Sequence, residues 1–389
     1  MKAKQLTCIS AVLFAFFIQG FCDIVGISSE YAREAFGWSH TMAGFLPSLV
    51  FVWFLFFSVP VGIKMNRWGR KNTVLVGMGV TVVGMLVPLI GTSWACLVGY
   101  AALGIGNAVL QVSENSLVKN VVTDGKLLTS SLTAGQVVKA ISSFCGPFIM
   151  LLAVNVLGAG DKTYWYYAFP IMGAVTLLSA LWLMVSPIPH EESQNTNVTI
   201  GETFGILRNK TILLLFFGIF FAVSIDVGTN FVSGKVMIQR YGWDLAQAGI
   251  APQVYFICRT IGAFMGMFVM TKIADMVYFR LNIVACIAVI LILAFVPFGA
   301  TASLVCIGAI GFLCSCIFPI ILSMAVRSMP DKANLISGLM ITAVAGGGAV
   351  TPFIGWATDS YGTITAGVCV LLVCAGYLTY CAFGVKTKK

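Results

Sequence analysis

The segment Gly62-Ile63-Lys64-Met65-Asn66-Arg67-Trp68-Gly69-Arg70-Lys71 is a short basic stretch between two long apolar stretches, residues 41–64 and 72–91. A helix that crosses a bilayer needs about 20 mostly apolar residues, and both stretches are long enough. Lysine and arginine gather in the cytoplasmic loops of membrane proteins. The segment therefore predicts a cytoplasmic turn between two membrane-spanning helices.

Similar apolar stretches continue along the whole chain. They are expected at about residues 7–34, 41–64, 72–91, 95–119, 128–156, 163–187, 211–238, 247–271, 279–298, 302–326, 335–357 and 363–384. Only 10% of the 389 residues are charged, whereas a soluble domain carries about 25%. We therefore predict an all-α polytopic membrane protein with twelve transmembrane helices. The longest polar connector, 188–210, divides it into two six-helix bundles, 1–187 and 211–389, with a cytoplasmic linker between them.

The positive charges predict the orientation. With the N-terminus inside, most of the 23 lysines and arginines fall in inner loops: Lys2, Lys4, Lys64, Arg67, Arg70, Lys71, Lys119, Lys126, Arg208, Lys210, Lys272, Arg280, Arg327, Lys332, Lys386, Lys388 and Lys389. This bias predicts cytoplasmic N- and C-termini in a plasma membrane, of the bacterial inner-membrane type. It also accounts for the net charge of +9 without a nucleic-acid partner.

The two halves of the chain carry a repeat. Residues 36–47 contain an aromatic residue, Gly, Trp and, nine residues after the Trp, a Pro; residues 241–252 have the same pattern and spacing. An acid precedes each Gly-Trp pair, Asp23 in the first copy and Asp226 in the second. An even number of predicted spans separates the copies, so they have the same topology. The repeat predicts two bundles related by a pseudo-twofold axis.

The basic segment between spans two and three resembles the cytoplasmic signature of the major facilitator superfamily, Gly-x3-Asp-Arg-x-Gly-Arg-Lys. The matching residues are Gly62, Arg67, Gly69, Arg70 and Lys71, with Asn66 where the family usually has Asp. The resemblance implies a gating motif formed by these six residues. The Asn removes one charge from that motif.

Within the superfamily, the chain is similar to the fucose–proton symporter family of sugar transporters. The similar segments are Asp23 after Gln19, residues 104–115, residues 318–323, and residues 346–355 followed by Asp359 and Gly362. The resemblance implies proton-coupled symport of a monosaccharide (a hexose, deoxyhexose or amino sugar) by alternating access. The implied partners are the sugar, protons and the lipid bilayer, with a monomeric chain and no cofactor.

Five ionisable residues fall well inside predicted spans: Asp23, Glu114, Lys139, Asp226 and Arg259. Each costs about 2.5–3.5 kcal/mol at the centre of a lipid-exposed helix, so we expect them to face a wet cavity. Polar residues at helical spacing accompany them. The expected substrate-binding residues are Gln19, Asn107, Gln111, Asn115, Gln136, Lys139, Asn230, Tyr255 and Arg259.

Three carboxylates are candidates for proton coupling. Asp23 matches the first-span aspartate of the symporter family, and a permanent ion pair with Lys139 or Arg259 is the alternative reading. Asp226 is its repeat mate. Glu114 is either a third coupling residue or a partner of the arginines in the signature loop.

The two cations leave the charge of the substrate open. Lys139 and Arg259 come from different halves, and together they suit a carboxylate-bearing ligand. An acidic sugar of the sialic acid or hexuronate type is therefore the alternative substrate, and a drug–proton antiporter of the same fold is the other alternative. The sequence contains no phosphate-binding loop, no paired nucleophile and base, and no metal-ligand spacing, so we expect neither an enzyme nor a metal site.

Overall fold

The computed structural model describes residues 2–38, 40–122, 128–189, 199–243, 245–296 and 299–385, and every regular element in these ranges is helical. Eleven helical segments of this described chain are long and apolar enough to cross a membrane. They do not include α11 (Ile250–Val269), which has 20 residues but carries the polar side chains of Gln253, Tyr255 and Arg259. The predicted all-helical, multi-pass architecture is confirmed. Part of the predicted linker, 190–198, lies outside the described residues.

The chain divides into two compact units. Unit 1 comprises Met1–Leu128, Val138–Phe204 and Met329–Thr342, and unit 2 comprises Thr129–Val137, Gly205–Ser328 and Ala343–Lys389. A short segment of each half of the sequence thus belongs to the unit formed mainly by the other half. The sequence-based division at 188–210 stays a prediction, as does the cytoplasmic position of the termini.

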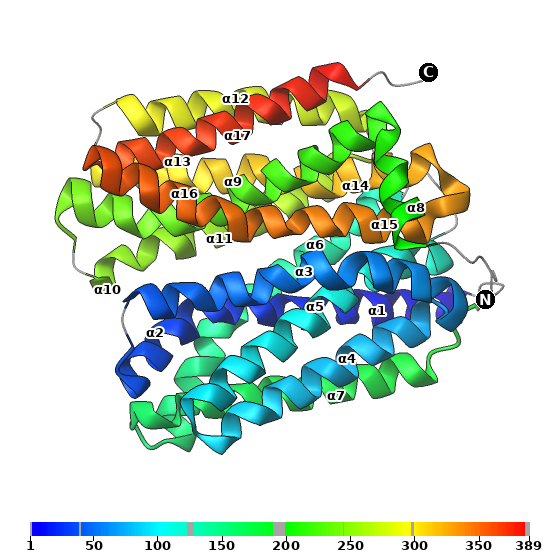
Figure 1. The fold of residues 1–389 in the computed structure, drawn as a ribbon, viewed down its shortest axis with the longest axis horizontal. Coiled ribbons are helices and arrows are strands. Elements are labelled where there is room, and N and C mark those ends of the chain that lie inside the picture. Colours follow the sequence, from blue (N-terminus) through cyan, green and yellow to red (C-terminus); the bar gives the residue numbers. More distant parts are fainter. Residues whose placement is uncertain are drawn as a thin grey trace. The chain divides into compact units, whose positions relative to one another are not determined.

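Unit 1 is built mainly from the N-terminal half of the chain (Figure 1). Its elements are α1 (Lys2–Gln19), η1 (Gly20–Ile24), α2 (Val25–Phe36), α3 (His40–Trp68), α4 (Arg70–Leu86), η2 (Val87–Ile90), α5 (Ser93–Val121), most of α6 (Leu128–Leu152), η4 (Ala153–Leu157), η5 (Lys162–Tyr167), α7 (Ala168–Val185), α8 (Ile200–Gly205), η7 (Pro330–Lys332) and α15 (Ala333–Thr342). Helix α4 packs between α5 and α7, and α15 packs against α3 and α5.

Unit 2 contains most of the C-terminal half. Its elements are η6 (Ile206–Arg208), α9 (Lys210–Tyr241), α10 (Leu245–Ala248), α11, α12 (Asp275–Phe295), α13 (Ala300–Cys314), α14 (Ile317–Ser328), η8 (Ala343–Ala345), α16 (Gly346–Tyr361) and α17 (Ile364–Gly384), together with the first turns of α6. The N-terminus of α9 is capped by the Asn209 side chain, which accepts hydrogen bonds from the backbone N–H groups of Thr211 and Ile212.

Among the described residues, three of the spans consist of two α-helices separated by an interruption. The first changes from α-helix to the 3₁₀ segment η1 at Gly20, the tenth is broken between α13 and α14 just before Pro319, and the eleventh contains the 3₁₀ turn η8 just before Gly346. Tighter 3₁₀ segments inside a helix often mark hinges. Span seven, by contrast, is the single 32-residue helix α9. The two acids of the sequence repeat therefore lie in different types of helix: Asp23 is in the 3₁₀ segment η1, and Asp226 is in the α-helix α9.

Candidate functional site

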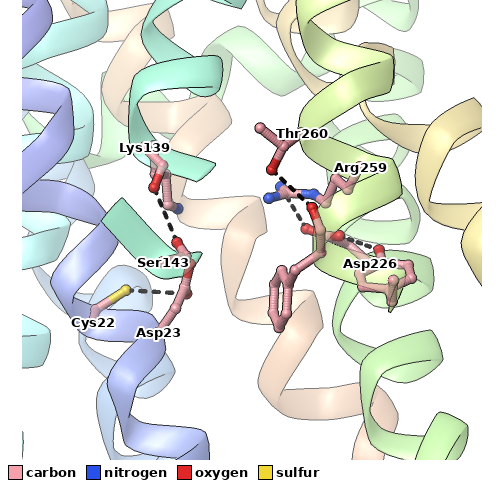
Figure 2. A network of polar contacts seen from close by, with 9 residues as sticks. Cys22, Asp23, Lys139, Ser143, Asp226, Arg259 and Thr260 are labelled. Atoms are coloured by element: carbon pink, nitrogen blue, oxygen red, sulfur yellow. Dashed lines mark hydrogen bonds and ion pairs between the residues drawn. The ribbon is translucent and has the colours of Figure 1, made fainter. Parts of the chain in front are cut away.

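The first cluster of polar side chains lies in unit 1, where η1 meets α5 and α6. Ser143 of α6 donates a hydrogen bond from Oγ to Asp23 Oδ2 at 2.5 Å. The neighbouring Cys22 donates from Sγ to Asp23 Oδ1 at 3.5 Å and accepts from Asn107 Nδ2 at 2.9 Å. Figure 2 shows Cys22, Asp23 and Ser143 turned toward one another. The carboxylate of Asp23 is therefore held by neutral groups.

Lys139 lies one helical turn before Ser143 on the same helix, α6. Its half-buried side chain makes no ion pair with a described carboxylate, although its charge acts on Glu114 and on Cys22. Its backbone carbonyl is closely packed against η1, because a Cβ placed on Gly20 would collide with the Lys139 oxygen and with Ser142. Glycine at position 20 thus lets η1 approach α6 closely enough for Asp23 to reach Ser143.

The polar face predicted on α5 is buried, and much of its hydrogen-bonding capacity is unused. Glu114 is 0% exposed, and neither of its carboxylate oxygens has a hydrogen-bond partner. The side-chain oxygens of Asn107 and Asn115 and both amide atoms of the buried Gln19 are also unpartnered, while Gln111 is buried beside them along the helix. Buried polar groups are normally paired with protein or with ordered water. This face can therefore accommodate water or a hydroxyl-rich ligand.

The second cluster lies in unit 2 and surrounds Asp226. Arg259 Nη2 of α11 forms an ion pair with Asp226 Oδ2 at 2.8 Å, with side chains 15% and 27% exposed, respectively. The hydroxyl of the fully buried Tyr255 donates to Asp226 Oδ1. Figure 2 shows Arg259 and Asp226 joined in this way, with Thr260 beside them. Tyr255 and Arg259 are four residues apart on one face of α11, so both reach the same carboxylate.

The two clusters differ in charge. Around the first cluster, the described charged groups are the carboxyl groups of Asp23 and Glu114 and the ammonium group of Lys139. The second cluster has one carboxylate, Asp226, and one guanidinium group, Arg259, which are paired with each other. The three groups around the first cluster are therefore neutral in sum only when one of the two carboxyl groups is protonated, whereas the Asp226–Arg259 pair is neutral without a proton.

The remaining predicted binding residues, Gln136 and Asn230, take no part in either network of described residues. Gln136 is buried with an unpartnered Nε2, and it lies in the first turns of α6 that belong to unit 2. Asn230 is half-buried on α9, one turn after Asp226, and its backbone carbonyl accepts a hydrogen bond from Ser233. Their assignment as substrate-binding residues stays a prediction.

The predicted gating segment forms the turn between α3 and α4. Gly69 has φ +79°, a conformation that only glycine adopts readily. Asn66 accepts a hydrogen bond at 2.8 Å from Asn334 of α15, and Arg70 Nε donates to the same Asn334 side chain at 2.9 Å. A Cβ on Gly62 would lie 2.8 Å from the Asn334 carbonyl oxygen, so α3 and α15 are in backbone contact here. At the position where the signature usually has a charged Asp, this chain thus has Asn66, whose side chain is hydrogen-bonded to that of Asn334.

The other residues of this segment also have defined positions. Lys71 donates to the backbone carbonyls of Met184 and Ser186 at 2.9 and 2.8 Å, which ties α4 to the end of α7. Arg67 lies in the last turn of α3. Neither oxygen of Glu114 has a hydrogen-bond partner, so the proposed pairing of Glu114 with the signature arginines is absent from this structure.

Unit 2 contains a comparable contact that is ionic. Arg327 at the end of α14 pairs with Asp275 of α12 at 3.1 Å. Thr129, at the start of α6, donates to Asp275 Oδ2 at 3.0 Å and lies 2.5 Å from the Ser323 hydroxyl. This contact links the first turn of α6 to α12 and α14. The sequence does not indicate this contact, because Asp275 and Arg327 lie at the ends of predicted spans, where charged residues are typical of loops.

The family follows from a comparison with known sequences. The profile of the Major Facilitator Superfamily matches residues 8–352, which is most of the chain. The chain belongs to the Major Facilitator Superfamily. It is similar to a putative glucose/galactose transporter of Helicobacter pylori (strain ATCC 700392 / 26695), at 23% identity over 398 residues, covering 98% of this chain and 96% of the relative. A glucose/galactose transporter of Brucella abortus biovar 1 (strain 9-941) is 22% identical over 391 residues, covering 96% and 92%.

Solved structures show the same fold. The crystal structure of FucP, a Major Facilitator Superfamily transporter in the outward conformation, gives a TM-score of 0.84 at 18% identity, over 97% of this chain and 99% of that one. A variant of the E. coli fucose:proton symporter FucP gives 0.82 at 18% identity, over 97% and 98%. The major facilitator fold and the resemblance to the fucose–proton symporter are thereby confirmed.

Two residues of the unit 1 cluster were absent from the predicted site. Ser143 follows Lys139 by four residues, and helical spacing groups it with Gln136 and Lys139 in one polar stripe, although it is not among the expected substrate-binding residues. Cys22 had no such signal, because a cysteine in an apolar span reads as a packing residue.

Proposed function

We propose that this chain is a secondary transporter that carries a monosaccharide together with a proton by alternating access. Its full-length similarity to bacterial glucose/galactose transporters and its fold, shared with a fucose:proton symporter, support a sugar as the cargo. The buried amides and the unpartnered oxygens of α5 suit a ligand rich in hydroxyl groups. We expect a neutral hexose.

The observation that carries the proton coupling is the balance of charge around the first cluster. Asp23 and Glu114 share one described cation, Lys139, and Asp23 is bound by a hydroxyl group instead of a cation. A carboxylate with a full ion-pair partner loses that partner's stabilisation when it accepts a proton. Asp23 has no such partner to lose, so we assign proton carriage to Asp23. We assign Asp226 and Arg259 to substrate binding and to the closure of unit 2.

The test is uptake into proteoliposomes that contain the purified chain. Labelled D-glucose, D-galactose, L-fucose, N-acetyl-D-glucosamine and D-glucuronate are offered with an inside-alkaline pH gradient, with a sodium gradient, or with neither. We expect one or more neutral sugars to accumulate only with the pH gradient, and a protonophore to abolish the accumulation. Accumulation that requires sodium, or that is unchanged by the protonophore, contradicts the proposal.

A second candidate substrate is an acidic sugar, and one observation favours it. Lys139 is half-buried and makes no ion pair with a described carboxylate, so its ammonium group is available to a carboxylate on the ligand. Removing a cation that binds a desolvated carboxylate costs about 3–5 kcal/mol, a loss of affinity of several hundred-fold or more.

Lys139→Gln separates the two substrates. If D-glucuronate is the cargo, the substitution weakens its binding several hundred-fold and leaves the binding of D-glucose much less affected. If the cargo is neutral, Lys139→Gln weakens its binding by less than about tenfold and shifts the pH dependence of uptake. Equal and small losses for both sugars exclude the acidic sugar.

A further inference from the structure

The hydroxyl of Ser143 lies between two acceptors. Its Oγ is 2.5 Å from Asp23 Oδ2 and 3.1 Å from the backbone carbonyl oxygen of Lys139, one turn earlier in α6. A serine hydroxyl has one proton and two lone pairs, so it can donate to only one of these oxygens at a time. The side chain is 9% exposed, and bulk water therefore does not compete strongly for either contact.

We propose that Ser143 is a positioning residue that satisfies Asp23 in both of its protonation states. When Asp23 is ionised, Ser143 donates its proton to Oδ2. When a proton from the medium binds Oδ2, the new O–H group donates to Ser143 Oγ, and the Ser143 hydroxyl rotates to donate to the Lys139 carbonyl. Ser143 keeps its own proton throughout, and the only bond made or broken is the Asp23 O–H bond.

The packing of η1 against α6 makes this exchange possible without moving a helix. Gly20 brings η1 against the carbonyl of Lys139, and a Cβ at that position would collide with it. This close packing places Asp23, the first acceptor, next to Ser143. The second acceptor is the backbone carbonyl of Lys139. In a continuous α-helix a serine can bond to the carbonyl four residues earlier, so α6 supplies this acceptor from its own backbone.

The titratable groups around Asp23 are few. From the described elements they are Cys22 of η1, which is hydrogen-bonded to Asp23, and Lys139 of α6, whose charge acts on Cys22 and on Glu114 of α5. None of the three forms an ion pair with Asp23 among the described residues, and only Cys22 is hydrogen-bonded to it. Ser143 is therefore the strongest hydrogen-bond partner of the Asp23 carboxyl group.

This inference rests on the proposed proton coupling, but it can be tested without sugar. The full-length protein in lipid nanodiscs is titrated from alkaline to acid pH while its infrared difference spectrum is recorded. The carbonyl stretch of protonated Asp23 is identified as the band that Asp23→Asn removes. In Ser143→Ala we expect this band at a higher frequency, because its hydrogen bond is lost.

Ser143→Ala should also change the pH at which the band of protonated Asp23 reaches half of its full intensity. A hydrogen bond to a charged acceptor is stronger than one between neutral groups, so losing Ser143 disfavours ionised Asp23 more than protonated Asp23. The band should then reach half of its full intensity about one pH unit higher than in the wild type. Ser143→Thr keeps the hydroxyl and should restore both the frequency and the midpoint. Ser142→Ala, which removes the adjacent hydroxyl that has no described partner, should change neither.

Three outcomes overturn the inference: an unchanged band in Ser143→Ala, a Ser143→Thr variant that behaves like Ser143→Ala, or no titration of Asp23 in the wild type. If Ser143→Ala does not fold, Ser143→Cys, which offers a weak donor in the same position, must give an intermediate frequency for the inference to stand. Failure of sugar uptake with a normal infrared titration contradicts the proposed function and leaves this inference intact.

Discussion

Asp23 and Asp226 hold matching positions in the sequence repeat, yet the structure surrounds them differently. Asp23 lies in the 3₁₀ segment η1 and is bound by the hydroxyl of Ser143 and the thiol of Cys22. Asp226 lies in the continuous helix α9 and is bound by the guanidinium of Arg259 and the hydroxyl of Tyr255. One acid therefore has neutral partners on an interrupted helix, and the other has a cation on an uninterrupted one.

The difference indicates how duplicated bundles can acquire separate tasks. A carboxylate paired with arginine keeps its charge and its position, which suits ligand binding or a fixed structural contact. A carboxylate held by a hydroxyl group can gain and lose a proton while its partner stays hydrogen-bonded. The 3₁₀ backbone of η1 adds a place where the first span can bend, and α9 has no such interruption at Asp226.

The largest expected effect comes from removing the cation of the second cluster. Arg259→Gln leaves the carboxylate of Asp226 with only the Tyr255 hydroxyl, at a cost of about 2–5 kcal/mol of stability because both side chains are largely buried. Asp226→Asn/Arg259→Gln removes both charges and should regain most of that loss. Thermal unfolding of the purified variants measures the difference. If the double variant is as unstable as the single one, charge is not the cause.

A smaller effect is expected from the cation of the first cluster. Lys139→Gln leaves Asp23 and Glu114 without a nearby described cation, and we expect the initial rate of uptake to fall by about tenfold. Lys139→Gln/Glu114→Gln restores the balance of charge and should recover most of the rate. Glu114→Gln alone serves as the matched control. Recovery with Lys139→Gln/Asp331→Asn, in which the second change is an exposed acid, would instead indicate a nonspecific charge effect.

The backbone around the two acids should also respond differently. A Cβ on Gly20 meets the Lys139 carbonyl and Ser142, whereas one on Gly228 of α9 meets the ends of the Leu371 and Ile354 side chains. Gly20→Ala should therefore cost about 1–3 kcal/mol and disturb the pH dependence of uptake, because it pushes η1 away from α6. Gly228→Ala should cost less, since side-chain ends can rotate. Equal unfolding temperatures and equal pH profiles for the two variants would contradict the close packing of η1.

The smallest expected effect sharpens the contrast between the two hydroxyl groups. Tyr255→Phe removes one hydrogen bond from Asp226 but leaves the ion pair with Arg259, so stability should fall by about 0.5–1.5 kcal/mol. The pH dependence of uptake should not change. Ser143→Ala, which removes the hydroxyl at Asp23, should change it. A shifted pH profile in Tyr255→Phe would mean that Asp226 also takes part in proton coupling.

Much of the fold could be predicted from the sequence, because apolar stretches of membrane length and loop charges are local features. The signature segment at residues 62–71 identified the superfamily for the same reason. The partners of the buried charges could not be predicted in this way. Asn334 lies far along the chain from Asn66, and nothing local indicates that an amide would replace the missing charge of the signature.

The site was partly predictable. Helical spacing grouped Tyr255 with Arg259 and brought Lys139 near Ser143, since both pairs are four residues apart. It could not distinguish the partners of Asp23 from those of Asp226, because both acids precede a similar Gly-Trp pair. That distinction depends on which helices approach each acid, and at Asp23 the approach depends on the absence of a Cβ at Gly20.

The most direct test of the account is the number of protons taken up with each sugar molecule. A weakly buffered suspension of proteoliposomes is given the sugar that the wild type accumulates, and the alkalinisation of the medium is recorded together with labelled uptake. We predict proton uptake with sugar in the wild type and the same number of protons per sugar, at a lower rate because substrate binding is impaired, in Asp226→Asn/Arg259→Gln. We predict none in Asp23→Asn, which should still exchange labelled for unlabelled sugar. Proton uptake that persists in Asp23→Asn, or that disappears only in the Asp226→Asn/Arg259→Gln variant, would contradict the assignment of the proton to Asp23.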